Sequence, residues 1–276
     1  MSTDTIETSI GPVPVLHRLA LGLIGHDVVT DRGTTGPLRV GWEAAGHLLP
    51  PGREAWWPCV DFERVGGGRF RLRATPGRPD QLTVRLYDPS RRYVPRRLGV
   101  TLWPYGALVD PAPANLIAVA ARTLPIWLFP GAAYPVSPGM TAVRGRITRQ
   151  GLPLPWARVN AVDGGGAILG RAHGDDRGEF LMLIGDTNQN PLQSTVTVNL
   201  VVRGPGGPPP PAPVLDPPPE PVARPSNPPL PAELDNPLLR GRTTPAGYVA
   251  NTAVIQPLIV KVGEEIVLPT DVPFNP

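Results

Sequence analysis

Arg69-Phe-Arg-Leu-Arg-Ala74 is the clearest β-strand in this sequence. Its phenylalanine, leucine and alanine alternate with three arginines, and successive side chains of a strand point to opposite faces of a sheet. One face of this strand is therefore predicted to cover a core while the other meets water, as in many antiparallel sheets. Gln81-Leu-Thr-Val-Arg-Leu86 has the same two-residue period, and the turn-forming residues Thr75-Pro-Gly-Arg-Pro-Asp80 lie between the two segments.

The composition favours short strands over helices throughout the chain. There are 40 prolines and 31 glycines, and a proline inside a helix costs about 3 kcal/mol, so long helices are not expected. Short strands joined by Pro/Gly turns fit this composition better. Other segments rich in alternating or β-branched residues are 19–24, 38–42, 97–102, 143–148, 157–162, 167–171, 179–184 and 194–202. Residues 115–123 form a short apolar run that could be either a helix or a strand.

A proline-rich run interrupts this pattern. Between Pro205 and Ala232, half of the 28 residues are proline. In polyproline II form such a run advances about 3.1 Å per residue, so it could reach up to roughly 85 Å. Strand-like sequence returns afterwards at 254–262 and 265–268. These last strands could complete a sheet of their own chain, or that of a neighbouring subunit by strand addition.

Residues 143–202 carry three short motifs in a recognisable order. They are Val143-Arg-Gly-Arg-Ile147, then Gly151 and Pro153 before Ala157-Arg-Val159, and finally Asp175-Asp-Arg-Gly-Glu-Phe180. With these motifs the segment resembles the carboxypeptidase regulatory-like domain, a transthyretin-like (prealbumin-like) β-sandwich. The residue types agree with that resemblance, because a glycine accepts a turn with positive φ and a following phenylalanine anchors a core.

The resemblance implies a β-sandwich that serves as a non-catalytic module, and it names no activity. Gly68-Arg-Phe-Arg-Leu72 and Gly178-Glu-Phe-Leu-Met182 form a weak internal repeat, which favours a duplicated architecture. We therefore predict an all-β fold of two tandem transthyretin-like or Ig-like sandwiches, with a long proline-rich excursion before the C-terminal strands. The predicted parts are an N-terminal sandwich at 12–103, a connecting segment at 104–140, a carboxypeptidase regulatory-like sandwich at 141–203 plus 244–270, and a proline-rich extended segment at 204–243.

Charge and cysteine content narrow the class of protein. The net charge is +3. Basic residues outnumber acidic residues before residue 205, and acidic residues outnumber basic residues from there to the end of the sequence. Such a small charge argues against a dedicated nucleic-acid binder. Cys59 is the only cysteine, so no intrachain disulfide can form and the cores must hold the fold.

The chain start and its longest apolar run predict a location. Residues 1–10 are polar and acidic and lack the basic and apolar regions of a signal peptide. The longest apolar run, 116–129, is broken by Arg122 and Pro125 and is shorter than the roughly 20 residues that span a bilayer. We therefore expect no membrane span and a cytoplasmic protein, either free or within a particle assembled in the cytoplasm.

No catalytic, cofactor-binding or metal-binding constellation stands out. The four histidines have no metal-ligand spacing, and a zinc site needs about four convergent ligands. Asp27 beside His26 lacks any nucleophile motif, and we expect both to be polar loop residues. A further set of loop acids could bind calcium, although turn chemistry explains them without an ion. These acids are Asp163, Asp175, Asp176 and Asp186.

Two clusters are candidates for contacts with partners. One surrounds Tyr93 and could be a solvated face, a protein contact or a phosphate-binding site. Its members are Arg91, Arg92, Arg96 and Arg97. The other is Trp56-Trp57 beside Pro58, which could stack on a sugar or pack in a core or interface.

We expect a non-enzymatic structural or assembly protein without cofactors. The more specific hypothesis is a subunit of a large particle, such as a contractile phage-tail-like injection apparatus, that meets other subunits through its proline-rich segment and edge strands. The alternative is a β-sandwich module that binds carbohydrate or a cell surface through Trp56 and Trp57. Oligomeric state and binding of polysaccharide would separate the two hypotheses.

Overall fold

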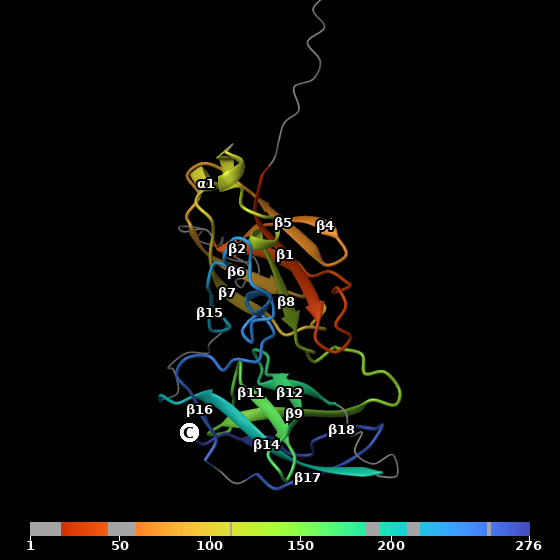
Figure 1. The fold of residues 1–276 in the computed structure, drawn as a ribbon. Coiled ribbons are helices and arrows are strands. Elements are labelled where there is room, and N and C mark those ends of the chain that lie inside the picture. Colours follow the sequence, from red (N-terminus) through yellow and green to blue (C-terminus); the bar gives the residue numbers. More distant parts are fainter. Residues whose placement is uncertain (1–17, 44–58, 111, 186–193, 209–215, 253–254) are drawn as a thin grey trace, which may run out of the picture.

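The computed structural model describes residues 18–43, 59–110, 112–185, 194–208, 216–252 and 255–276. Strands dominate, and the helices are short: α1 is Tyr105–Val109 and α2 is Pro231–Leu234. The predicted all-β fold class is confirmed. Figure 1 shows two lobes, an N-lobe built from two sheets and a C-lobe built from one large sheet.

The N-lobe packs two sheets against each other. The first has the strand order β4 (Glu63–Gly66), β5 (Arg69–Arg73), β1 (Leu19–Asp27) and β8 (Thr123–Leu128). The second has the order β15 (Glu220–Val222), β7 (Arg96–Thr101), β6 (Gln81–Tyr87), β2 (Arg39–Glu43) and β3 (Cys59–Asp61). Apolar side chains of both sheets, among them Leu23, Phe70, Leu86 and Leu98, form one continuous core.

The alternation in the two arginine-containing segments is confirmed. In β5 the phenylalanine and leucine are buried and the first two arginines exposed, and β6 buries Leu82, Val84 and Leu86. The two strands do not pair with each other: β5 pairs with β1 and β4, whereas β6 pairs with β2 and β7. The turn between them therefore carries the chain from one sheet of the N-lobe to the other.

Residues 104–140 contribute to the N-lobe as well as connecting it to the next part. After α1 the chain forms two 3-10 turns, η1 (Pro113–Asn115) and η2 (Ala120–Arg122), and then enters β8. β8 runs parallel to β1 and buries Leu124, Ile126 and Leu128. The ambiguous run is therefore neither a regular helix nor a strand over most of its length: it spans the end of η1, an irregular stretch and η2, and it leads into a core strand.

The C-lobe is a curled sheet with its own core. Its main path is β10 (Leu152–Pro153), β9 (Thr141–Arg149), β13 (Glu179–Ile184), β12 (Ile168–His173), β11 (Arg158–Val162), β14 (Thr195–Pro205) and β16 (Tyr248–Ala250). β17 (Leu258–Lys261) pairs with β14, while β18 (Glu265–Val267) and β19 (Val272–Pro273) pair with β9. The C-terminal strands thus complete the sheet of their own chain, and the C-terminus lies in this lobe (Figure 1).

A glycine and a phenylalanine fix the entry to β13 as the motif predicts. Gly178 has φ +73°, and a Cβ there would lie 2.6 Å from the carbonyl oxygen of Ile147, so no other residue fits without movement. Two residues later Phe180 is 2% exposed in the core of the C-lobe.

The proline-rich run returns to the N-lobe. We call residues 216–243 the strap. Within it β15 adds to the edge of the N-lobe by parallel pairing with β7, and α2 follows. Leu239, 1% exposed, inserts into the N-lobe core, and the Asn227 amide nitrogen donates a hydrogen bond of 2.9 Å to the carbonyl oxygen of Leu116. The described part of the run is therefore packed along the protein and does not stand away from it as a spacer.

The two lobes share apolar contacts. Along β13, Phe180 and Met182 face the C-lobe core, whereas Leu181 lies on the opposite face and belongs to the N-lobe core cluster. Ala142 of β9 lies beside it in the same cluster. Both residues are fully buried, so this part of the C-lobe sheet is covered on both faces.

Candidate functional site

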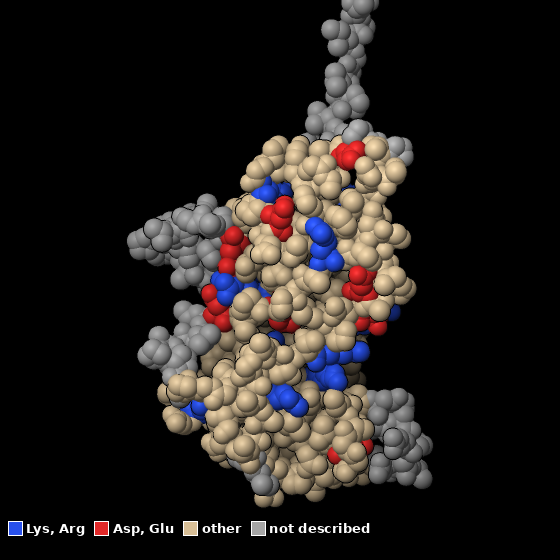
Figure 2. Space-filling model, turned by 60° about the vertical axis from the view of Figure 1, so that its left-hand side comes forward, with Lys and Arg blue, Asp and Glu red and all other residues tan. Residues whose placement is uncertain are grey.

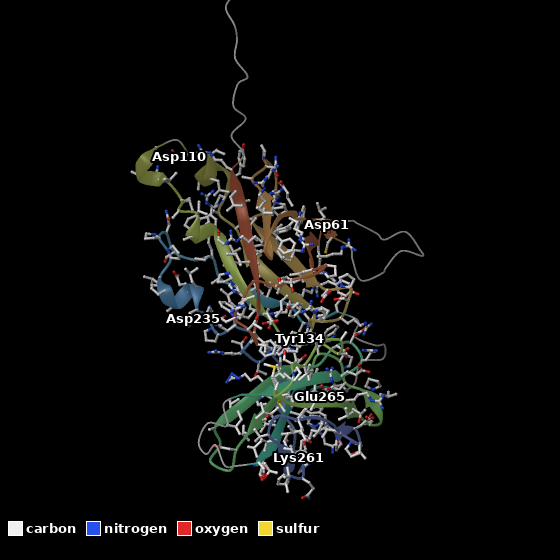
Figure 3. The ribbon with its side chains drawn as sticks, turned by 90° about the vertical axis from the view of Figure 1, so that its right-hand side faces the viewer. Asp61, Asp110, Tyr134, Asp235, Lys261 and Glu265 are labelled. Atoms are coloured by element: carbon white, nitrogen blue, oxygen red, sulfur yellow. The ribbon has the colours of Figure 1, made fainter. Side chains whose placement is uncertain are left out.

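Charged side chains gather where the two lobes meet. Figure 2 shows acidic and basic groups together in the band between the lobes, and Figure 3 shows Tyr134 at the same level. Several of the residues singled out in the sequence lie in this band, which we call the junction. It is the candidate functional site of the molecule.

Arg96 is at the centre of the junction and is 1% exposed. Its guanidinium donates to both carboxylate oxygens of Glu220 in the strap, at 2.7 and 3.3 Å. It also donates to the backbone carbonyl oxygens of Trp127, Leu238 and Leu239, at 3.0, 2.7 and 2.8 Å. All five contacts fall within the chain, so the side chain is committed to holding the strap on the N-lobe.

Glu220 joins both lobes to the strap. Its side chain is 5% exposed, and its second cationic neighbour is Arg158 of the C-lobe, with 3.5 Å between Nη2 and Oε1. Burial lowers the pKa of Arg158, an effect that the nearby Glu220 carboxylate opposes. Because removing one partner of a buried ion pair leaves an unpaired charge away from water, the triad Arg96–Glu220–Arg158 depends on all three members.

A second strap acid pairs on the outer face of the N-lobe. The Asp216 carboxylate accepts two hydrogen bonds from Arg85, at 2.6 and 2.8 Å. These hydrogen bonds lower the pKa of Asp216. Glu43 accepts bonds from Arg97 at 2.7 and 2.8 Å and also from Arg85. Burial alone would raise the pKa of Glu43, but its hydrogen bonds to Arg97 and Arg85 bring that pKa below its ordinary value.

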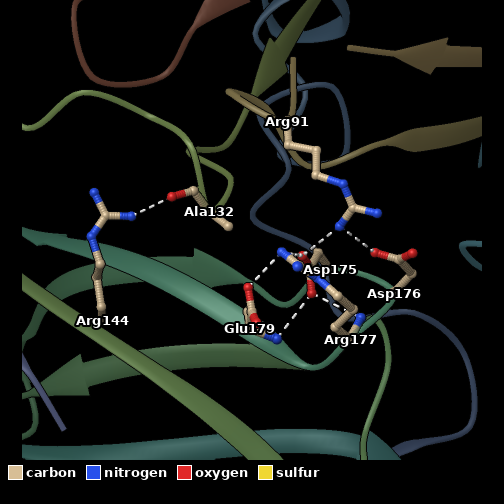
Figure 4. Close-up of polar contacts among 7 residues, drawn as sticks. All are labelled: Arg91, Ala132, Arg144, Asp175, Asp176, Arg177 and Glu179. Carbon is tan, nitrogen blue, oxygen red and sulfur yellow. Dashed lines mark hydrogen bonds and ion pairs between the residues drawn. The ribbon is translucent and has the colours of Figure 1, made fainter. Parts of the chain in front are cut away.

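Arg91 crosses from the N-lobe to the C-lobe. Figure 4 shows its guanidinium reaching the loop before β13, where it lies 3.3 Å from an Asp176 oxygen and 3.6 Å from an Asp175 oxygen. Asp175 is itself held in a turn, since its Oδ1 accepts from the backbone nitrogens of Arg177 and Glu179, both at 2.9 Å. The turn explanation for Asp175 is therefore sufficient, and no ion is needed to account for its position.

The four arginines around Tyr93 do not form one surface. Arg96 is an interior residue, so its assignment to an exposed cluster is wrong, because the strap covers it and Glu220 neutralises it. Arg97 and Arg91 are partly exposed and paired with acids of the same chain. Arg92 lies over the Tyr93 ring at 5.8 Å, and its buried Nε has no hydrogen-bond partner among the described residues.

The tryptophans fall into two groups. Trp56 and Trp57 lie outside the described residues, so their proposed sugar-stacking role stays a prediction. Trp127 and Trp156 are 6% and 3% exposed and pack inside the molecule. Arg240 of the strap lies over the Trp127 ring at 3.8 Å, which adds a cation–π contact between the strap and the N-lobe.

Asp27 has a structural role that the sequence did not reveal. It is 5% exposed and accepts hydrogen bonds from the hydroxyls of Tyr93 and Tyr134, at 3.0 and 2.8 Å. Burial is the main reason that the pKa of each tyrosine is raised, and the hydrogen bonds to Asp27 add to it. Nothing in the spacing of these residues, 66 and 107 positions from Asp27, indicates that they meet.

The histidines that the structure describes are packed against aromatic rings. His26 stacks on Trp127 with 4.8 Å between ring centroids, and His173 stacks on Phe129 at 3.9 Å. His173 is 2% exposed, and its Nε2 lies 2.9 Å from the carbonyl oxygen of Gly241 in the strap. Within the described ranges, no group of three or more His, Cys, Asp or Glu side chains is placed to hold a metal ion.

A small cavity of about 170 Å³ opens beside the junction. It is lined by parts of β6 and β7, by the loop before β13 and by the start of the strap. Its charged lining residues include Arg85, Arg91, Arg96, Asp175 and Asp216, all of which are paired within the chain.

No family model, curated protein or solved structure matches this chain. The resemblance of residues 143–202 to the carboxypeptidase regulatory-like domain therefore stays a prediction. In the described part of the chain, no helix is long and apolar enough to cross a membrane.

Proposed function

We propose that the protein is a non-enzymatic structural subunit of a multi-protein assembly. The observation that carries this proposal is the triad Arg96–Glu220–Arg158, in which one strap residue ties both lobes together. The charged and hydrogen-bonding side chains at the junction contact one another and join the strap to the two lobes, as we expect of a scaffold. An enzyme would instead leave catalytic groups with perturbed pKa values facing a cleft.

Exposed apolar side chains on edge strands are the surfaces through which such a subunit would meet others. Ile259 of β17 and Val267 of β18 are each 70% exposed, and Leu152 of β10 is 68% exposed. Each of these strands pairs on one side only within the described sheet. Unpaired edges bearing apolar residues favour contact with another chain.

The more specific form of the proposal is a contractile phage-tail-like injection particle. What supports it is the all-β architecture together with the sequence resemblance to a module that occurs in particle proteins. Genes for sheath and tube proteins beside the gene for this chain are the expected finding. A neighbourhood without any particle component would contradict this form of the proposal.

Light scattering after size-exclusion chromatography tests the assembly role, using co-expressed products of the neighbouring genes as partners. We expect the chain to co-elute with at least one of them. Val267→Lys and Ile259→Lys should reduce that co-elution, and Val119→Lys, a change at a 61% exposed position of the N-lobe that lies outside the strands, serves as the matched control. A chain that stays monomeric, binds polysaccharide and loses that binding on Trp57→Ala would instead support the carbohydrate-binding alternative.

A further inference from the structure

A second and larger hollow lies between the lobes, away from the triad. It has a volume of about 690 Å³ and is walled by Val28 and Val29 of the N-lobe and by Leu169 and Leu183 of the C-lobe. The end of the strap contributes to its rim. Its volume lies within the range of about 300–1,000 Å³ that is typical of small-molecule sites, and its lining combines apolar side chains with polar groups.

Among the described residues that line this groove, the charged side chains are two arginines, Arg171 and Arg242. Arg171 lies on β12 opposite Leu183, and Arg242 follows Gly241, whose carbonyl oxygen contacts His173. Burial lowers the pKa of Arg171, and the positive charge of Arg242 lowers it further. The groove therefore places two positive charges near each other, and an anion between them would be attracted to both.

The guanidinium groups of these two arginines have no hydrogen-bonding or ion-pairing partner among the residues that the structure describes. The contrast with neighbouring arginines is informative, because paired residues of adjacent strands share a face. Arg144 and Arg158 lie on the same face of the C-lobe sheet as Arg171, and they pair with Glu265 and Glu220. Arg171 thus differs from these two, since no acidic side chain within the described ranges pairs with it.

We propose that this groove binds a small amphiphilic anion, in which a carboxylate or similar group is joined to an apolar chain. The anionic end would lie between Arg171 and Arg242, because a guanidinium forms paired hydrogen bonds with a carboxylate. The apolar chain would cover the valines and leucines of the walls, where its burial is favourable by the hydrophobic effect. The proposal is independent of the assembly role, since it concerns a different surface of the molecule.

Isothermal titration calorimetry with dodecanoate, kept below the concentration at which it forms micelles, tests the site. We expect one dodecanoate per chain. Dodecyltrimethylammonium has the same chain length and the opposite charge, and it should bind at least about tenfold more weakly. The Arg171→Gln/Arg242→Gln double variant should lose at least about tenfold in affinity for dodecanoate, because hydrogen bonds to charged groups are among the stronger ones. It should also bind the two probes alike.

Two further variants keep the test independent of folding defects. Ile168→Asp places a negative charge at a 44% exposed position on the groove wall and should weaken dodecanoate binding by at least about tenfold. Arg177→Gln removes an exposed arginine outside the groove and should leave the affinity unchanged. Thermal unfolding of each variant verifies its fold. The proposal is overturned if dodecanoate does not bind, if the cation binds as well, or if Ile168→Asp and the folded double variant bind like the parent chain.

Discussion

A single carboxylate links three parts of this chain, since Glu220 of the strap lies between an arginine of each lobe. Replacing one member of a buried, hydrogen-bonded ion pair costs about 3–5 kcal/mol, because the remaining charge is left without its partner. We expect Glu220→Gln to lower the free energy of unfolding by about that amount in urea titrations.

A matched control for this prediction is available on the surface. Glu63 also contacts two arginines, Arg71 and Arg73, but all three side chains are at least 40% exposed. Solvent screening makes such a pair weak, so Glu63→Gln should destabilise the protein far less than Glu220→Gln. Equal losses of unfolding free energy in the two variants would show that Glu220 does not form a buried ion pair.

His173 should make the stability of the fold depend on pH in a range above that in which ordinary carboxylates titrate. Burial, and then the positive charges of Arg158 and Arg96, hold the pKa of His173 well below the ordinary 6.5. As pH falls through about 6.5 the unfolded chain takes up a proton at this histidine while the folded chain does not, so stability is present above that pH and lost below it.

Urea unfolding at two pH values measures this effect. Between pH 7.5 and pH 5.5 we expect a loss of about 1.4 kcal/mol that is attributable to His173, since a proton taken up only by the unfolded chain contributes that much over one pH unit. His173→Gln should remove this part of the pH dependence. A His173→Gln variant with the same pH dependence as the parent chain would exclude His173 as its source.

At the scale of elements, the strap is held by its apolar anchor as well as by its charges. Leu239 is 1% exposed in the N-lobe core, and truncating a buried leucine to alanine costs about 2–5 kcal/mol. Leu230, in the same strap, is 61% exposed, and a change there should stay within about 0.5 kcal/mol. Thermal unfolding of Leu239→Ala and Leu230→Ala compares the two positions. Similar small losses would mean that the strap is not docked through Leu239.

The strands of this fold were predictable where one face alone is buried. The alternation in β5 and β6 follows from the two-residue period that a half-buried strand shows. β8 was missed because it pairs in parallel with β1 across about a hundred residues and its short apolar run has no such alternation. The residues of β8 alone do not indicate which distant strand they will pair with.

The junction was less predictable than the strands, and the reason is the same. Arg96 and Arg97 are neighbours in sequence, but alternation along β7 turns one to the interior and the other to the outer face. Whether the inward arginine is tolerated depends on Glu220, which is 124 residues away. The proline content of the strap indicated an extended chain, and nothing in it specified β7 as the strand that it would join.

At the scale of the whole molecule, the strap and the shared core should make the two lobes unfold together. Leu181 and Ala142 of the C-lobe and Leu239 of the strap belong to the core cluster of the N-lobe. A cooperative transition requires that the loss of one lobe removes contacts on which the other depends. We therefore expect a single calorimetric transition whose measured enthalpy equals the van't Hoff enthalpy.

Substitutions at two neighbouring residues of β13 distinguish a loss of coupling between the lobes from a loss of stability within one lobe. Leu181→Lys places a charge in the shared core and should split the unfolding into two transitions, because it disrupts the buried apolar contact between the lobes while leaving the C-lobe core intact. Met182 is equally buried but faces only the C-lobe core, so Met182→Ala should lower the midpoint by destabilising that lobe and keep one transition. Two transitions in the parent chain would mean that the lobes fold independently. In that case the strap would only tether them, and the triad around Glu220 would contribute to the N-lobe alone.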